Sequence, residues 1–167
     1  VIGEAGLTTA LHQQGFVMTD TKPEYVVLGE TRNYSFSAIT QAIRLIEGGA
    51  KFIATNPDAS GPSPEGTLPA TGSVAALITT ATNRKPYFVG KPNPIMIRAG
   101  LNRIGVHSET TAFIGDRMDT DMRSGLEAGL QTHLVLSGST ALEDVSTYPF
   151  RPVAIHEGIG GVVPLVS

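Results

Sequence analysis

Short apolar runs alternate with amphipathic stretches along most of this chain. Five runs have the length of a strand and are rich in Val, Ile or Phe, at residues 26–29, 51–55, 87–90, 111–115 and 132–138. Four stretches have helical character and mostly end at a glycine, at residues 35–47, 72–82, 93–104 and 121–128. The alternation predicts an α/β fold with a largely parallel sheet, in which ligands bind beyond the carboxyl ends of the strands.

One stretch, residues 56–72, interrupts this alternation. It holds four of the eleven prolines, too many for a helix or a central strand, and therefore predicts a long loop of the kind that is usually functional or disordered. We place a domain boundary near residue 85, because the segments before and after it each carry their own strands and helices.

Composition narrows the possible partners. The chain has 167 residues, 41% of them hydrophobic, which is enough for one ordinary domain or two small ones. A net charge of −3 and scattered Lys and Arg residues give no support for binding nucleic acid or an anionic membrane. Cysteine is absent, which excludes disulfides and thiolate metal sites. Without an apolar run of ~20 residues or a signal-peptide pattern, the chain is predicted to be soluble and cytoplasmic, with small molecules as partners.

Acidic residues gather directly after the strand predicted at 111–115. The sequence FIGDRMDTD contains three of the six aspartates, Asp116, Asp119 and Asp121. Asp116 follows the strand and Asp121 stands at the start of the next helix, so we expect their carboxylates to converge. Asp119 or Asp121 could instead cap the helix, which would not account for Asp116. Carboxylates at a strand end suit Mg²⁺, which takes one or two of them and keeps water and phosphate as its other ligands.

A lysine lies in a similar position one strand earlier. In VGKPNP, Lys91 follows the strand predicted at 87–90 and precedes a helix whose first turn carries Pro92 and Pro94. Alone, it would be interpreted as a solvated surface lysine. Together with Asp116 after the next strand, it indicates a fixed positive charge beside the proposed metal.

These motifs resemble a known family. GKPNP, followed about twenty residues later by a strand and GDRMDTD, resembles the third and fourth motifs of the haloacid dehalogenase (HAD) superfamily and, within it, the NagD-type phosphatases of subfamily IIA. The stretches VVLGETRNYSF, FIATNPD, AGLQTHLVLSG and YPFRP extend the resemblance over nearly the whole chain. The family fold is a Rossmann-like parallel sheet with an inserted α/β cap of the C2 type. By this resemblance, residues 1–85 form the cap and residues 86–167 the C-terminal half of the core.

The resemblance also implies roles for individual residues. Members transfer a phosphoryl group to an aspartate nucleophile and then to water, with Mg²⁺ between the carboxylates and the phosphate. Asp116 resembles the Mg²⁺ ligand of the fourth motif and Asp121 its second acid, which orients the metal's water shell or the lysine. Lys91 resembles the lysine that holds the nucleophile and the transferring phosphate, whereas Asp119 matches no fixed position. The candidates for substrate contact lie in the loop of the cap that faces the core, Asn56, Pro57 and Asp58.

Two motifs of the family are missing from the sequence. Its nucleophile lies in an Asp-x-Asp-Gly motif, and its second motif supplies a Ser or Thr; the Asp-x-Asp present here, Asp119 to Asp121, is followed by Met. The resemblance therefore implies a further N-terminal segment that carries the nucleophile. We expect an Mg²⁺-dependent phosphatase of small phosphorylated metabolites, such as nucleotide monophosphates or sugar phosphates, and no turnover by these 167 residues alone.

Two alternatives remain open. The chain could be a non-catalytic module that binds a ligand or a partner, and an incomplete core would favour a homo-oligomer because it leaves apolar sheet exposed. An upstream reading frame that encodes Asp-x-Asp-Gly would argue against this alternative. A phospho-receiver-like domain also uses aspartates, a lysine and Mg²⁺, but there the acidic pair precedes the lysine, the reverse of the order in this chain.

Overall fold

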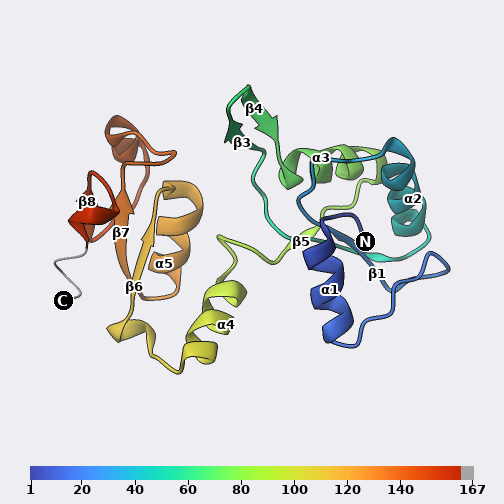
Figure 1. Cartoon of the computed structure of the whole chain (residues 1–167), viewed down its shortest axis with the longest axis horizontal. Helices are drawn as coiled ribbons and strands as arrows, with labels where there is room; N and C mark the ends of the chain where they lie inside the picture. The colour runs from blue at the N-terminus through green and yellow to red at the C-terminus, as the bar shows by residue number, and fades with distance from the viewer. Residues whose placement is uncertain (163–167) are drawn as a thin grey trace. The chain divides into compact units, whose positions relative to one another are not determined.

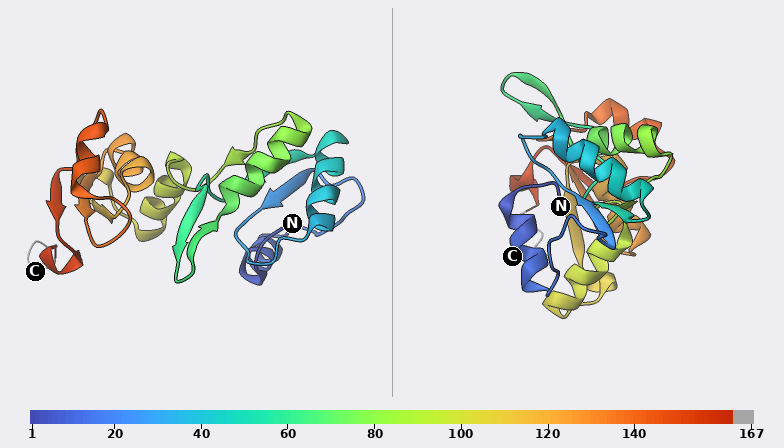
Figure 2. Two further views of the ribbon diagram at one scale, coloured as in Figure 1. Left: turned by 90° about the horizontal axis from the view of Figure 1, so that it is seen from above. Right: turned by 90° about the vertical axis from the view of Figure 1, so that its right-hand side faces the viewer.

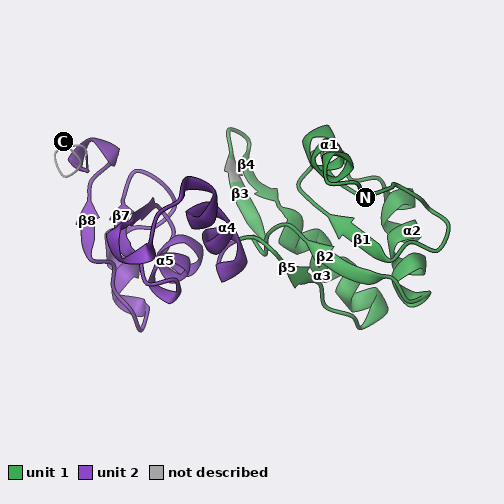
Figure 3. Cartoon of the chain, turned by 90° about the horizontal axis from the view of Figure 1, so that it is seen from below, with its two compact units in different colours: residues 1–90 green, residues 91–167 purple. Residues whose placement is uncertain are grey.

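The computed structural model of the chain describes residues 1–162, apart from the side chain of Pro62. The chain divides into two compact units, Val1–Gly90 and Lys91–Ser167 (Figure 3). The division lies a few residues beyond the boundary that we expected near residue 85. The identification of the first unit as a cap and of the second as half of a core stays a prediction. No helix in residues 1–162 is both long enough and apolar enough to cross a membrane.

The first unit is built on a parallel sheet in the order β1-β2-β5. Its strands are β1 (Tyr25–Leu28), β2 (Lys51–Ala54) and β5 (Tyr87–Phe88). Its helices are α1 (Ala5–Gln13), α2 (Phe36–Glu47) and α3 (Thr71–Thr82). The helices α2 and α3 pack side by side against the sheet, and α1 lies away from that pair (Figures 1 and 2).

Alternating side chains of β1 and β2 form the core of this unit. Leu28 and Ala54 are fully buried at the ends of their strands, two positions after the buried Val26 and Phe52. This spacing of two places all four side chains on one face of the sheet. The helices contribute Ile46 and Ile78, both fully buried, to the same cluster. The predicted strands and helices of this unit are thus confirmed, with shifts of a few residues at their ends.

The proline-rich stretch forms a structure that we did not predict. Strands β3 (Ser60–Ser63) and β4 (Gly66–Pro69) pair as an antiparallel hairpin outside the parallel sheet. The expectation of a loop throughout 56–72 was therefore wrong for these residues. Proline is tolerated in a two-stranded ribbon, where outward-facing N–H groups need no partner strand. Gly66, with φ +115°, supplies the left-handed backbone at the turn.

Helix α1 was also absent from the prediction. None of its residues is buried, and Glu4 before it makes no capping hydrogen bond through its side chain. Its large apolar residues, Leu7 and Leu11, cover a single turn, and no capping residue precedes them, so the sequence signal for a helix is weak.

The second unit has its own parallel sheet in the order β6-β7-β8. The strands are β6 (Ala112–Gly115), β7 (Gln131–Val135) and the unpredicted β8 (Ala154–His156), and the helices are α4 (Pro94–Ile104) and α5 (Arg123–Glu127). Short helical turns lie at Ser108–Thr110, Leu142–Thr147 and Ile159–Gly161, and a π-helical turn at Met118–Met122. The core of this unit contains Met118, Met122, Leu134 and Val145.

One predicted strand belongs to a different sheet from the one that we expected. We assigned residues 87–90 to the second part of the chain, in the same sheet as 111–115. In the structure β5 pairs with β2 in the first unit, and β6 pairs with β7 in the second. Lys91 is therefore the first residue of the second unit and does not follow a strand of that unit's sheet.

Candidate functional site

Three of the predicted site residues lie together in the second unit. The Nζ atom of Lys91 is 2.5 Å from Oδ1 of Asp121. The other oxygen of this carboxylate, Oδ2, accepts hydrogen bonds from the main-chain N–H groups of Asp116 and Arg117, each at 3.2 Å. The buried carboxylate of Asp121 is thus hydrogen-bonded both to the Lys91 ammonium and to the main chain at Asp116.

The π-helical turn at Met118–Met122 directs Asp121 into this cluster. The N–H of Met122 donates to the carbonyl of Arg117, five residues earlier, which is the hydrogen bond that defines a π turn. Met118 and Met122 anchor the turn, because both are almost completely buried in the core. Asp121 is 3% exposed, and its side chain lies so close to Gly115 that a Cβ atom there would be 2.4 Å from the Cβ of Asp121.

This geometry corrects the alternative in which Asp121 caps a helix. A capping side chain accepts from N–H groups two or three residues later. Asp121 instead accepts from residues four and five positions earlier. The predicted helix 121–128 is confirmed in part, since α5 covers residues 123–127 and the π turn precedes it.

Asp116 is held by the loop that follows β7. Its Oδ2 atom accepts the main-chain N–H of Ser139 at 2.7 Å. Partial burial alone would raise the pKa of Asp116, but the hydrogen bonds from Ser139 and the neighbouring Arg117 charge together outweigh it and hold the pKa below the usual aspartate value. Asp116 is therefore ionised at neutral pH.

Asp119 lies outside this cluster. Its two oxygens accept from Nε and Nη2 of Arg117 at 3.1 and 3.0 Å. This bidentate pair lowers the pKa of Asp119, against the opposing effect of partial burial. The side chain is 49% exposed, so Asp119 faces solvent.

Lys91 is placed just before the start of α4. Asn93 caps that helix, since its Oδ1 accepts the N–H of Ile95 at 3.0 Å. Pro94 occupies the first helical position, where its missing N–H is of no consequence. The Lys91 side chain is 37% exposed, but its ammonium is bound to a carboxylate that is 4% exposed. The alternative of a freely solvated surface lysine does not describe this contact.

The other predicted site residues lie in the first unit, at the carboxyl end of β2. Thr55 Oγ1 donates to Asn56 Oδ1, and Asn56 Nδ2 donates to Asp58 Oδ2, both at 2.8 Å. The carbonyl of Asp58 accepts the N–H of Gly72 in the first turn of α3. The main chain of Pro57 also lies close to Gly72: a Cβ atom added at residue 72 would be 2.2 Å from the Pro57 carbonyl oxygen. This loop is therefore well ordered by its own contacts, and its role in substrate contact stays a prediction.

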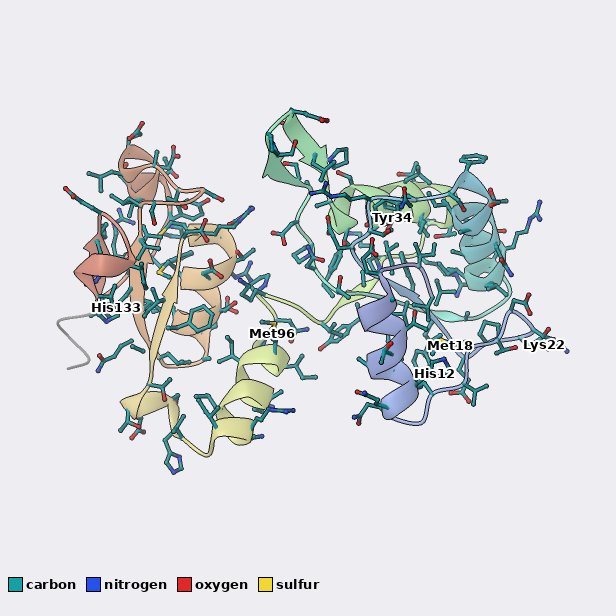
Figure 4. All side chains as sticks on the ribbon, in the orientation of Figure 1. His12, Met18, Lys22, Tyr34, Met96 and His133 are labelled. Carbon is teal, nitrogen blue, oxygen red and sulfur yellow. The ribbon has the colours of Figure 1, made fainter. Side chains whose placement is uncertain are left out.

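Two further residues hold the same edge of the first unit's sheet. Glu30 follows β1, and its Oε2 accepts the N–H of Thr71 at 3.1 Å and the Thr71 hydroxyl at 2.7 Å. The hydroxyl of Tyr34, which is labelled in Figure 4, donates to the carbonyl of Gly29 at 3.0 Å. Sequence reasoning did not single out Glu30, because its partner lies 41 positions later.

The side chains of this cluster suit an Mg²⁺ site to which this chain contributes one carboxylate ligand. In the described residues, no group of three or more His, Cys, Asp or Glu side chains is arranged to hold a metal. Asp116 is ionised and partly exposed, whereas both oxygens of Asp121 are engaged by Lys91 and by two N–H groups. Because Mg²⁺ in proteins is often bound through one or two carboxylates with water and phosphate as the remaining ligands, Asp116 fits such a site.

Comparison with known proteins gives consistent matches. Residues 88–161 match the family model described as HAD-hydrolase-like. The dihydroxyacetone phosphatase of Corynebacterium glutamicum is 65% identical over 159 residues, which are 95% of this chain and 58% of that protein. The ribonucleotide monophosphatase NagD of Escherichia coli is 44% identical over 97% of this chain and 64% of that protein. The chain thus spans about three fifths of the length of these relatives.

Solved structures match equally well. The structure of NagD from E. coli K-12 has a TM-score of 0.86 with 44% identity, covering 94% of this chain and 62% of that one. The 4-nitrophenylphosphatase of Thermotoga maritima has a TM-score of 0.92 with 34% identity, covering 99% and 64%. The α/β fold with parallel sheets that the sequence predicted is therefore confirmed.

Proposed function

Because this chain belongs to the HAD-like hydrolases, and among them to the NagD-type phosphatases, we propose that it is part of an Mg²⁺-dependent phosphatase of small phosphorylated metabolites. The observation that carries the proposal is the ion pair between Lys91 and the buried Asp121, whose second oxygen binds the backbone of Asp116. The pair fixes a positive charge relative to an ionised carboxylate at a strand end.

This arrangement has the properties that phosphoryl transfer needs from a protein. The transferring group is anionic, and catalysis rests largely on positioning and on charge neutralisation. Lys91 supplies a cation whose position is set by Asp121, so little reorganisation is required when a phosphate arrives. Its partly exposed side chain allows the ammonium to contact a ligand while it remains bound to Asp121.

In this proposal Asp116 holds the metal. When bound, Mg²⁺ would neutralise charge on the phosphate oxygens and polarise the phosphorus–oxygen bond. Asp121 would contribute indirectly, since it holds Lys91 and the N–H groups of Asp116 and Arg117 in place. It can also accept from a water molecule of the metal's shell, which retains the role that the resemblance gave it.

The chain itself supplies only part of the catalytic machinery in this proposal. No Asp-x-Asp-Gly motif occurs in the sequence, and the relatives that match are longer than the matched region. We therefore expect the aspartate nucleophile, and the aspartyl-phosphate that it forms, to come from residues outside this sequence. The 167 residues alone should not release phosphate, because covalent transfer requires a nucleophile.

The substrate class follows from the relatives and from the first unit. The relatives are named dihydroxyacetone phosphatase, ribonucleotide monophosphatase and acid sugar phosphatase. We propose sugar phosphates or nucleotide monophosphates as substrates here. Asn56, Pro57 and Asp58 are the candidates for contact with the non-phosphate part, because the amide and carboxylate at the end of β2 offer hydrogen-bonding groups on a loop with fixed geometry.

The test is phosphate release from p-nitrophenyl phosphate by the complete product of the gene, with Mg²⁺ and with EDTA. We expect release that depends on Mg²⁺ and falls about a hundredfold or more in Asp116→Asn and Lys91→Met, as for the loss of one preorganised charge in a catalytic site. Asp144→Asn is the matched control, since Asp144 is an exposed aspartate of the same unit.

Three outcomes would count against the proposal. They are the absence of Mg²⁺-dependent release, an effect of Asp144→Asn equal to that of Asp116→Asn, and ligand binding by the complete protein without turnover. The last outcome would favour the non-catalytic binding module. A panel of sugar phosphates and nucleotide monophosphates then tests the substrate class, with Asn56→Ala expected to raise KM more than it lowers kcat.

A further inference from the structure

The loop after β7 makes three hydrogen bonds with the loop after β6, and Thr140 is central to them. The N–H of Thr140 donates to the main-chain carbonyl of Asp116 at 3.1 Å. Its side-chain Oγ1 accepts the N–H of Met118 at 3.3 Å. The preceding residue, Ser139, donates its N–H to the carboxylate of Asp116. Thr140 thus contacts the backbone on both sides of Arg117.

The hydroxyl of Thr140 satisfies a donor that the fold leaves without a helical partner. Met118 opens the π turn, and the first N–H groups of a helical segment have no acceptor within it. Met118 is fully buried and Thr140 is 9% exposed, so water is a poor substitute. An aliphatic side chain at residue 140 would leave this N–H buried without an acceptor, which is unfavourable.

The same loop lies against the carboxylate of Asp116. A Cβ atom at Gly138 would be 2.1 Å from Asp116 Oδ2 and 2.5 Å from its Cβ. The carboxylate therefore has little freedom on this side, where it is held by the N–H of Ser139. Its orientation depends on the position of residues 138–140, and the side chain of Thr140 is what ties these residues to the start of the π turn.

We propose that Thr140 is a positioning residue for Asp116, and that through Asp116 it sets the affinity of the protein for Mg²⁺. The inference rests on the proposed function for the identity of the ion, and on the hydrogen bonds above for the positioning. Thr140 itself touches neither the ion nor the substrate in this proposal. Removal of groups that orient a metal ligand commonly weakens metal binding about 10- to 100-fold.

The experiment compares Thr140→Val, Thr140→Ala and Thr140→Ser in the complete product of the gene. Val keeps the shape without an acceptor, Ser keeps the acceptor, and Ala serves if Val does not fold. The first measurement is amide hydrogen exchange of Ser139 by NMR, which reports the contact with Asp116 without any metal. The second is the Mg²⁺ dissociation constant, from the shifts of the Asp116 and Ser139 amide signals.

In Thr140→Val and Thr140→Ala we expect faster exchange of the Ser139 amide and an Mg²⁺ dissociation constant raised about tenfold or more. In Thr140→Ser we expect both values to stay close to those of the unchanged protein. Lower thermal stability with unchanged Ser139 exchange in Thr140→Val or Thr140→Ala would overturn the inference, since Thr140 would then be merely structural. Loss of protection in Thr140→Ser equal to that in Thr140→Ala would also overturn it.

The result separates this inference from the proposed function. If the unchanged complete protein shows no response to Mg²⁺ while the exchange pattern is as expected, Thr140 positions Asp116 but the link to Mg²⁺ is refuted, and with it the metal role of Asp116 in the proposed function. If Mg²⁺ binds equally well to all variants, the metal site stands and the positioning role of Thr140 is refuted.

Discussion

The ammonium of Lys91 lies 2.5 Å from Oδ1 of Asp121, although thirty positions separate the two residues in the sequence. Asp121 is almost fully buried, and a buried charge is tolerated only when it is paired and its remaining lone pairs are satisfied. Here the second oxygen accepts two main-chain N–H groups. Asp121 is therefore as much a structural residue of the loop after β6 as a candidate for chemistry, and its replacements should separate these two roles.

Asp121→Ala should destabilise the chain by about 1–3 kcal/mol, because it leaves two N–H groups and the Lys91 ammonium without their acceptor. Asp121→Asn should have a smaller effect, since its side-chain oxygen can still accept from the N–H groups of Asp116 and Arg117. Urea unfolding of the two variants beside the unchanged chain measures the difference. Equal stability of Asp121→Ala and the unchanged chain would mean that these hydrogen bonds contribute nothing to the fold.

Gly115→Ala should displace Asp121, because the new Cβ would lie 2.6 Å from its Oδ2 atom. We expect lower stability and a change in the NMR signal of the Lys91 ammonium, whose partner moves. Gly100→Ala is the matched control: Gly100 lies inside α4, and a Cβ there meets nothing within 4 Å. It should stabilise the helix by about 0.5–1 kcal/mol. Similar losses in both variants would contradict the close packing at Gly115.

The sequence predicted the parts of the fold that rest on local patterns. Apolar runs bounded by turns located β1, β2, β6 and β7, and the aspartates of FIGDRMDTD were placed at the end of a strand because strand and loop are adjacent in the chain. Lys91 was expected near Asp116 because the two were taken to follow neighbouring strands. They do lie near the same carboxylate, yet the strand before Lys91 belongs to the sheet of the first unit.

The features that the sequence did not predict depend on long-range contacts or lack a local pattern. The π turn is one: Asp121 has the spacing of a helix start, and only its hydrogen bonds to upstream N–H groups show otherwise. Thr140 acts on Met118, 22 positions earlier. Strand β8 has three residues, and the apolar run at 153–155 is shorter than the roughly four to eight residues by which a buried strand is detected in a sequence. Such contacts appear only once the sheets are assembled.

Asp116 should make stability depend on pH in the acidic range. Its pKa in the folded chain is below the unfolded value of about 3.9, so the ionised carboxylate stabilises the fold above that value. This stabilisation is lost as the pH falls below the unfolded pKa and through the lower pKa of the folded chain. Asp116→Asn should therefore reduce the loss of unfolding free energy on acidification, measured by urea unfolding from pH 7 to pH 2.

Asp119 contributes to the acid dependence in the same direction, because its pKa is lowered by Arg117. Its exposure weakens that contribution through solvent screening. Asp144→Asn, at an exposed residue of the same unit, is the matched control. If Asp116→Asn and Asp144→Asn give the same acid profile as the unchanged chain, the hydrogen bonds from Ser139 do not lower the pKa of Asp116.

The ring of His133, labelled in Figure 4, forms a hydrogen bond with the ring of His156 across β7 and β8, with Nδ1 and Nε2 3.0 Å apart. The ring planes are nearly parallel, and the ring centroids are 5.3 Å apart. This separation equals the distance between the two nitrogens plus the distance from each nitrogen to the centroid of its own ring, so the two centroids and the two nitrogens lie on one line. The two rings therefore meet edge to edge in nearly one plane and do not stack face to face.

This geometry predicts strong coupling between the two histidines. His133 is 8% exposed, so His156→Leu leaves a buried nitrogen without its partner and should destabilise the chain by about 1–3 kcal/mol. The double variant His133→Leu/His156→Leu should recover part of that loss, because it removes both polar groups. Urea unfolding of the two single variants and the double variant at one fixed pH gives the coupling energy, and strictly additive effects would show that the hydrogen bond contributes nothing.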